Sequence, residues 1–318
     1  MKQQLFEQQH QHTWSQIEKY LEKSKGAEDS AFCAENYMLL CQHLALSKQR
    51  LYDTALIERL NKLVMQLYRE LYRYRSDSRI NLRAFFVQKF PLALYQHRYF
   101  IALALLVFVL PGLIAGIWIF FDENAIYSVL DNASVRQIEG MYDPAARVLG
   151  RERESETDIF MFGFYIQNNI SVAFRCFAAG LLAGVGTLFV LFFNGLHIGS
   201  IAGHLTRLDY VDTFYPFVVT HGAFELTAIV FSGAAGLRLG FALLNPGPFS
   251  RLNSLKLAGR DAIPMLYGIV LMLVIAAFIE AFWSSSASLP INVKYTVGGI
   301  CWFLVLIYCL SARKYGPR

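Results

Sequence analysis

Apolar side chains in the first third of the chain follow the spacing of amphipathic helices. Between residues 51 and 71 they recur every three or four positions with charged residues between them, which predicts a helix with one buried face. Residues 5–23 and 30–48 show weaker versions of this pattern, separated by the turn-forming segment SKGAEDS at 24–30. The pattern predicts a soluble helical region over residues 1–98.

Longer apolar stretches follow, and they predict membrane spans. A bilayer core of about 30 Å requires roughly 20 apolar residues in a helix. Residues 214–241 are apolar but contain His221, Glu225 and Arg238. Their length alone therefore does not decide whether they cross the membrane. The predicted spans are residues 100–121, 176–194, 262–282 and 295–312, with 214–241 as a re-entrant segment or a further span.

These patterns divide the chain into a soluble region at 1–98 and a membrane domain at 99–318. Residues 81–100 mix phenylalanines with basic residues, which favours an interfacial helix at the end of the soluble region; a direct continuation into the first span is the alternative. A polar extracytoplasmic insert at 122–160 interrupts the membrane domain. The predicted fold class is all-α, a polytopic transmembrane helix bundle with an N-terminal soluble helical region.

Composition agrees with a membrane protein. Hydrophobic residues make up 55% of the chain and charged residues 17%, whereas a soluble domain carries about 25% charge. An aromatic content of 15% excludes a disordered chain. Five cysteines in 318 residues are too sparse for a disulfide-stapled secreted module.

Charge is distributed asymmetrically about the first span. Residues 1–98 hold 15 basic and 10 acidic side chains, whereas the insert holds 4 and 9. Because Lys and Arg near span ends mark the cytoplasmic side, residues 1–98 are predicted to be cytoplasmic and the insert to lie across the membrane. The basic C-terminus is then cytoplasmic as well, which requires an even number of crossings. Four spans with a cytoplasmic hairpin at 195–244 satisfy this, as do six crossings; five crossings are the alternative.

Three ionisable residues within the apolar stretches form the candidate polar site. His221 and Glu225 are four residues apart, so they share one face of a helix. Glu280 lies near the end of another predicted span. Because a carboxylate is costly in hydrocarbon, such groups face the bundle interior, pair or serve function. We expect these three residues, with Asn194, to form either a buried structural tie or a site that passes protons or holds a cation.

Small residues spaced four apart predict close helix packing. Such GxxxG pairs lie inside or beside the apolar segments, and they suit both an internal bundle and a homodimer face. The predicted helix-packing glycines are Gly180, Gly184, Gly195, Gly199, Gly236 and Gly240, with further pairs at Gly112–Gly116 and Gly199–Gly203.

Motifs of catalysis and cofactor binding do not occur in the sequence. The sequence contains no GxSxG, Walker A or GxGxxG motif at a strand–helix turn. It also contains neither HExxH nor paired CxxC motifs, and His-xxx-Glu alone is a weak metal signal. We therefore expect no enzyme, no cofactor and no metal. The basic stretch at 69–98 is expected to meet anionic lipid rather than nucleic acid.

The segment HGAFELTAIVFSGAAGLRLG at 221–240 resembles the SpoIIM family, the stage II sporulation protein M family. Further similar segments are YIQNNISVAF at 165–174, FAAGLLAGVGTLFVLFFNGLHIG at 177–199, NPGPFSR at 245–251 and AAFIEAF at 276–282. Residues 51–72 resemble the soluble N-terminal part of the long, Gram-negative-type members.

The resemblance implies a multi-pass protein of the bacterial cytoplasmic (inner) membrane. The founding member of the family resembles a scaffold that recruits peptidoglycan-degrading enzymes, and the family offers no established catalytic residues to carry over. We therefore expect a non-enzymatic scaffold or assembly factor for envelope or cell-wall machinery, with envelope proteins or cell-wall enzymes as partners. The alternative is a transporter or permease built around His221, Glu225 and Glu280. An intramembrane hydrolase is disfavoured, because no nucleophile or metal set is present.

Overall fold

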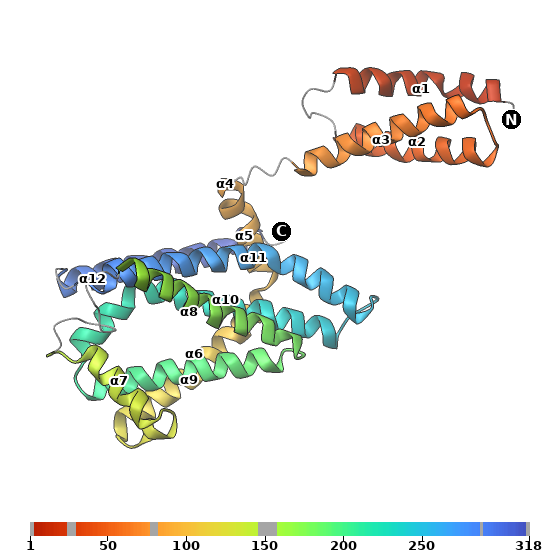
Figure 1. Cartoon of the computed structure of the whole chain (residues 1–318). Helices are drawn as coiled ribbons and strands as arrows, with labels where there is room; N and C mark the ends of the chain where they lie inside the picture. Colours follow the sequence, from red (N-terminus) through yellow and green to blue (C-terminus); the bar gives the residue numbers. More distant parts are fainter. Residues whose placement is uncertain (1–2, 24–29, 77–81, 146–157, 287–288, 316–318) are drawn as a thin grey trace. The chain divides into compact units, whose positions relative to one another are not determined.

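Helices account for all the regular structure in the described residues, which are 3–23, 30–76, 82–145, 158–286 and 289–315 of this computed structural model (Figure 1). The predicted all-α class is therefore confirmed. Contacts divide the chain into two units, Met1–Asn81 and Leu82–Arg318. The predicted turn at 24–30 and the insert residues 146–157 lie outside the described residues, except for Ser30 at the start of a helix.

The first unit consists of three helices, α1 (Gln3–Lys23), α2 (Ser30–Gln49) and α3 (Thr54–Ser76). They correspond to the three periodic segments of the sequence. Their apolar faces meet in one core, because residues three or four apart on each helix point the same way. The fully buried side chains of this core are Phe6, Trp14, Ile17, Leu40, Leu60 and Leu67.

Polar contacts between these three helices fix their positions relative to one another. The Arg59 guanidinium of α3 donates to both carboxylate oxygens of Glu18 in α1, over 2.9 and 3.1 Å. It also lies 5.7 Å from the centre of the Trp14 ring. The Trp14 indole N–H donates to Nδ1 of His43 in α2 over 3.1 Å. One aromatic side chain therefore links all three helices.

The second unit begins earlier than the predicted membrane domain. Its first elements are α4 (Leu82–Ala84), the π-helix η1 (Phe85–Lys89) and α5 (Phe90–Gln96). Phe90, Ala93 and Leu94 are buried in the largest apolar core of this unit. Contacts therefore group residues 82–98 with the second unit, because Phe90, Ala93 and Leu94 pack against the other helices of that unit.

The remaining elements of this unit are mostly long helices. The insert contributes only the short η2 and α7, and Asp131 caps α7 by accepting from the Ser134 N–H over 2.7 Å. The elements are α6 (Arg98–Phe121), η2 (Ala125–Ser128), α7 (Asn132–Tyr142), α8 (Asp158–Ala178), η3 (Ala179–Leu181), α9 (Val185–Arg207), α10 (Val211–Leu244), α11 (Arg251–Phe278), η4 (Ile279–Ser284), α12 (Ile291–Ser311) and η5 (Ala312–Tyr315).

Helix α10 lies at the centre of the second unit. It contacts each of α6, α8, α9, α11 and α12. Its sequence is apolar on all sides and rich in glycine and alanine, which is typical of a helix surrounded by others. Polar residues in the middle of α10, such as Thr220, His221 and Ser232, consequently lie inside the bundle, whereas Asp212 at its start is exposed.

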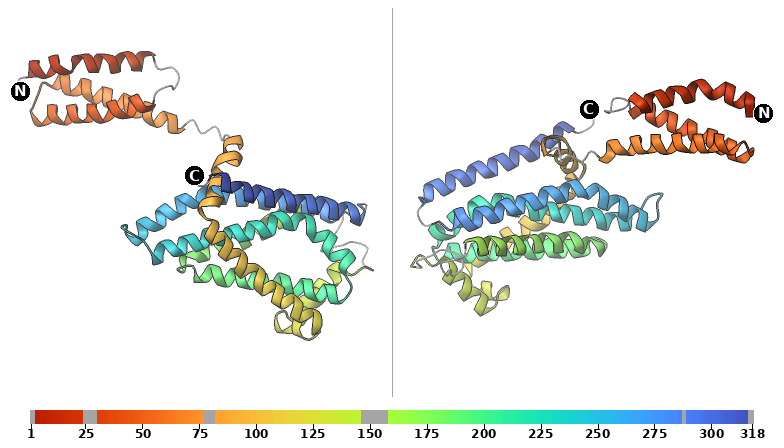
Figure 2. Two further views of the ribbon diagram at one scale, coloured as in Figure 1. Left: turned by 180° about the vertical axis from the view of Figure 1, so that it is seen from behind. Right: turned by 45° about the horizontal axis from the view of Figure 1, so that its top comes forward.

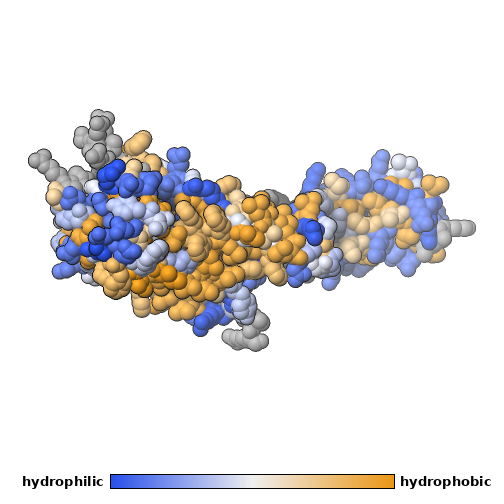
Figure 3. All heavy atoms as spheres, turned by 90° about the horizontal axis from the view of Figure 1, so that it is seen from below, coloured by the Kyte–Doolittle hydropathy of each residue, from blue (hydrophilic) through white to orange (hydrophobic). Residues whose placement is uncertain are grey.

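Five helices of the described chain are long and apolar enough to cross a membrane: α6, α9, α10, α11 with η4, and α12 with η5. Helices α6 and α12 leave many large apolar side chains exposed. Figure 3 shows a broad apolar surface on one face of the molecule. An apolar surface of this extent is stable against lipid chains rather than water. The chain is thus a multi-pass membrane protein.

The predicted span at 176–194 is wrong. Helix α8 ends at Ala178, a 3₁₀ turn follows, and α9 begins only at Val185. Ala183 and Gly184 both have positive φ, which breaks the helix. The break lies within an apolar stretch, so hydropathy did not reveal it.

The predicted re-entrant hairpin at 195–244 contains a real turn, at residues 208–210, but both of its arms are full helices. Helix α10 runs unbroken for 34 residues, so it is long enough to cross a bilayer. Of the two predicted alternatives for this segment, its length favours a full span over a re-entrant segment.

Candidate functional site

The structure brings together the three predicted ionisable residues. His221 and Glu225 lie on one face of α10, and Glu280 lies on η4 at the end of α11. One ligand-type atom from each residue lies within 4.8 Å of those of the other two. Two helices distant in sequence therefore place an imidazole and two carboxyl groups at one point.

The ring of His221 is held in a fixed orientation. Its Nδ1 lies 3.0 Å from the Ser284 hydroxyl oxygen, and the side chain is only 6% exposed. The other ring nitrogen, Nε2, lies 3.9 Å from a carboxylate oxygen of Glu225, which is beyond hydrogen-bond reach. The ring therefore directs Nε2 toward the carboxylate without a direct hydrogen bond between them.

A π-helix supplies the other side of the cluster. Residues Ile279–Ser284 form η4, in which the wider turn continues α11. Glu280 and Ser284 are four positions apart in it, so both face α10. Single-turn π segments in α-helices often occur at functional sites. The wider turn changes the direction in which the side chains point.

A buried lysine connects the cluster to α12. Lys294, which is 4% exposed, donates from its ammonium group to the Ser284 carbonyl over 2.8 Å. The Lys294 carbonyl in turn lies 3.4 Å from the Thr220 hydroxyl, which donates to it. The start of α12, the end of α11 and the N-terminal half of α10 are thus tied by polar contacts.

Asn194 occupies a different setting. Its amide donates to the Val190 carbonyl in its own helix, α9, over 2.7 Å. The structure provides no contact between Asn194 and the His221 cluster, so its membership of the polar site stays a prediction.

The glycine pairs lie at helix crossings. A Cβ added to Gly112 would meet the Gly195 carbonyl oxygen at 2.8 Å, and one added to Gly199 would collide with the Gly112 carbonyl. These contacts make a seam between α6 and α9, which lie side by side in Figures 1 and 2. A second pair of contacts joins Gly180 with Gly236 and Gly184 with Gly240.

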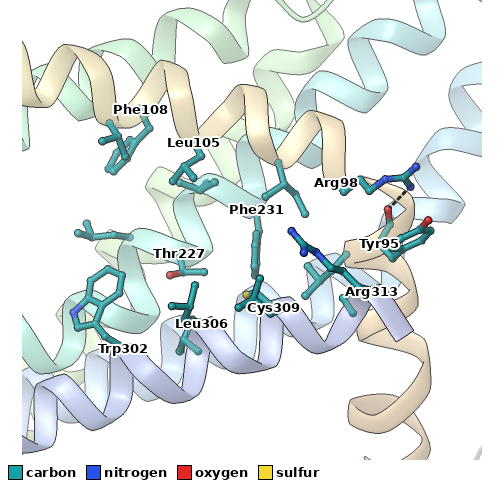
Figure 4. Close-up of a pocket in the computed structure, with 18 residues that line it drawn as sticks. Tyr95, Arg98, Leu105, Phe108, Thr227, Phe231, Trp302, Leu306, Cys309 and Arg313 are labelled. Atoms are coloured by element: carbon teal, nitrogen blue, oxygen red, sulfur yellow. Dashed lines mark hydrogen bonds between the residues drawn. The ribbon is translucent and has the colours of Figure 1, made fainter. Parts of the chain in front are cut away.

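Two cavities of the membrane unit have apolar walls. The first, of about 480 Å³, lies between α5, α6, α10 and α12 (Figure 4). Arg98 and Arg313 lie at one end of it, and Trp302 and Phe108 at the other. The second, of about 470 Å³, follows the glycine seam of α6 and α9. The residues that line these two cavities do not include the His221 cluster.

Comparisons with known proteins give the family. A profile described as stage II sporulation protein M matches residues 104–285, more than half of the chain. The chain belongs to this family. A second profile, for a domain of unknown function, matches residues 4–73. An uncharacterized protein of Methanocaldococcus jannaschii is 26% identical over 130 residues, which cover 39% of this chain and 70% of that protein. No solved structure matches the chain.

The stage II sporulation protein M match extends from α6 to the end of η4. It includes the three cluster residues and Ser284, and it ends before Lys294. The family is not known as a catalytic family. Sequence reasoning missed Ser284 and Lys294, because a lone serine and a lysine at a span end carry no motif that singles them out.

Proposed function

We propose that this stage II sporulation protein M family member is a non-enzymatic scaffold or assembly factor for cell-envelope machinery in the bacterial cytoplasmic membrane. The supporting observation is the closed state of the polar cluster. His221 is almost fully buried and its ring is fixed by Ser284, while the two described cavities are apolar and run elsewhere. Such a site stabilises helix packing rather than passing a solute.

The insert supports a docking role on the extracytoplasmic side. The described part of the insert is anchored to α9 by an ion pair of Arg207 with Glu123 and by a hydrogen bond between His204 and Glu139, each 2.8 Å long. The anchored insert presents a fixed surface in which acidic residues outnumber basic ones. Such a surface suits a partner protein with a basic face. The partners expected on this side are envelope proteins, including cell-wall enzymes.

The N-terminal three-helix unit supports a second docking surface. It has its own apolar core, so it needs no membrane contact to bury its hydrophobic faces. We place it in the cytoplasm because of the basic residues between it and α6. The protein would then connect cytoplasmic and extracytoplasmic partners.

Site-specific photo-crosslinking in native membranes tests this proposal. A photo-reactive residue replaces Gln137, which is exposed on α7, and a control replaces the exposed, lipid-facing Ile300 of α12. We expect Gln137 to give a discrete adduct with one envelope protein that Ile300 does not give. An adduct pattern that is the same at both positions, or one limited to lipid, would contradict a scaffold that uses the insert.

A transporter is the second candidate, and the convergence of His221, Glu225 and Glu280 favours it. Ionisable groups inside a helix bundle are typical of proton and ion pathways. This candidate requires that the cluster open to both sides during a transport cycle. A measurement of ion flux through proteoliposomes that contain the protein separates the two candidates.

A further inference from the structure

We propose that His221, Glu225 and Glu280 bind one divalent transition-metal ion of the zinc class within the membrane unit. From the sequence alone no metal is expected, because His-xxx-Glu is a weak signal. The structure adds the third ligand, Glu280, from another helix, with ligand-type atoms of all three residues within 4.8 Å of one another. This inference concerns ligand binding and does not depend on the scaffold proposal.

The donor set is suited to such an ion. One imidazole nitrogen and two carboxylate oxygens are ligands of Zn²⁺ and of neighbouring divalent transition metals, whereas Ca²⁺ and Mg²⁺ prefer oxygen alone. Three protein ligands from two helices leave a coordination position for water. Thiolate is absent from the cluster, so a soft Cu(I) site is disfavoured.

The distances are within reach of coordination. With metal–ligand bonds of about 2.1 Å, ligand atoms in a tetrahedral site lie roughly 3.4 Å apart. The His221 and Glu225 atoms, 3.9 Å apart, would have to approach by about 0.5 Å, and no pair by more than about 1.4 Å. A glutamate side chain can do so by rotation about its own bonds. The backbone of α10 and η4 need not move.

Ser284 acts as a positioning residue in this arrangement. Metal-binding histidines usually donate from the ring nitrogen that does not bind the metal, which fixes the tautomer and the ring plane. Here Nδ1 of His221 is 3.0 Å from the Ser284 hydroxyl oxygen, so a proton on Nδ1 leaves the lone pair of Nε2 facing Glu225. The full burial of Ser284 holds that orientation.

Charge balance also favours a cation. Two carboxylates held close together inside a helix bundle repel each other unless a proton or a metal ion lies between them. A divalent ion, a neutral imidazole and two carboxylates together carry no net charge, and the Lys294 ammonium, bound to the Ser284 carbonyl, is a further buried cation nearby. The Glu225 side chain is 20% exposed, so it is the less buried member of the His221–Glu225 pair.

Calorimetric titration of the full-length protein in detergent tests the proposal. The protein is freed of metal with a chelator and titrated with Zn²⁺, and Mg²⁺ serves as the hard-cation comparison. We expect one Zn²⁺ per chain and weak or no Mg²⁺ binding. Glu280→Gln and His221→Asn should abolish Zn²⁺ binding, and Ser284→Ala should weaken it roughly 10–100-fold. The control, Glu123→Gln, changes a carboxylate paired with Arg207 and should leave Zn²⁺ affinity unchanged.

A second measurement keeps the test decisive if a cluster variant fails to fold. Co²⁺ added to the wild-type protein should give visible d–d absorption typical of a low-coordinate nitrogen–oxygen site, and Zn²⁺ should displace it. Zn²⁺ binding of equal strength in wild type and folded Glu280→Gln would overturn the proposal. So would a folded wild-type protein that binds neither ion.

Discussion

Two buried histidines form hydrogen bonds of different kinds in the two units. His221 in the membrane unit meets a serine hydroxyl through Nδ1 and directs Nε2 toward a carboxylate. His43 in the N-terminal unit accepts the Trp14 indole N–H at Nδ1 and stacks near His10, with ring centroids 4.0 Å apart. A protonated His43 ring loses that accepting nitrogen and gains a charge in an apolar core.

This arrangement predicts acid sensitivity in the N-terminal unit. Burial, with a smaller contribution from His10, lowers the pKa of His43 from 6.5 to about 4. The unfolded chain therefore binds the proton more readily than the folded chain between these values, so stability is complete above pH 6.5 and falls as the pH drops toward 4. We expect the urea midpoint of the Trp14 signal to be lower at pH 5 than at pH 7.

The measurement uses full-length protein in which Trp118, Trp283 and Trp302 are replaced by Phe, so that fluorescence reports on Trp14 alone. His43→Gln should flatten the dependence on pH, whereas His12→Gln, at an exposed position, should retain it. A midpoint that does not change between pH 7 and pH 5 would contradict this role of His43.

The sequence could predict which polar residues lie close together only where the position of a residue on its own helix determines this. His221 and Glu225 share a face because they are four residues apart. Glu280 was a candidate because a carboxylate in an apolar run must face inward. Ser284 and Lys294 could not be predicted, because their roles arise from where α11 and α12 end in space.

At the scale of elements, the crossing of α6 and α9 depends on glycine. The two helices run parallel, since Gly112 meets both Gly195 and Gly199, and Gly116 meets Gly199 and Gly203. Without side chains at the seam the backbones approach closely, and packing of this kind holds helices together in lipid.

Gly199→Ala should destabilise the membrane unit, because its Cβ would collide with backbone rather than with a movable side chain. The expected cost is about 1–3 kcal/mol, the usual penalty of overpacking. Gly299→Ala is the matched control, since nothing lies within 4 Å of its added Cβ. Thermal unfolding in detergent measures both, and equal midpoints for the two variants would show that the seam is not close-packed.

Element boundaries were predictable where hydropathy changes and not where it stays constant. The ends of α6 follow the charged residues around it, and the three N-terminal helices follow their periodicity. The break at 179–184 lies inside an apolar run. Gly180 approaches Gly236 there and Gly184 approaches Gly240. The GxxxG spacing predicted close packing by these glycines but not the break in the helix.

For the whole molecule, the packing of α8 bears on the number of crossings. Helix α8 is less apolar than the five candidate spans, but it packs along α10 and α11. Met161 and Tyr165 near its start lie against Ala277 and Ala281, and Cys176 near its end lies against Gly236. It therefore runs antiparallel to α11 as a member of the bundle. We predict that α8 also crosses the membrane, and six crossings would place both chain ends on one side of it.

Thiol labelling checks this topology in a variant without native cysteines. We expect a membrane-impermeant maleimide to label Asn124→Cys, in the insert, in intact cells. Asn253→Cys, at the start of α11, should react only after permeabilisation. Labelling of Asn253→Cys in intact cells would instead support five crossings with the basic ends outside.

The central claim is that the membrane unit is a closed bundle whose polar cluster holds helices together. Flux through proteoliposomes containing the full-length protein tests it most directly, with Glu225→Gln as the matched variant. We predict that wild-type vesicles pass protons, K⁺ and Zn²⁺ no faster than empty vesicles, and that Glu225→Gln lowers the unfolding temperature of the protein. Flux above that of empty vesicles in wild type, abolished by Glu225→Gln with thermal stability intact, would contradict the claim and establish a transporter.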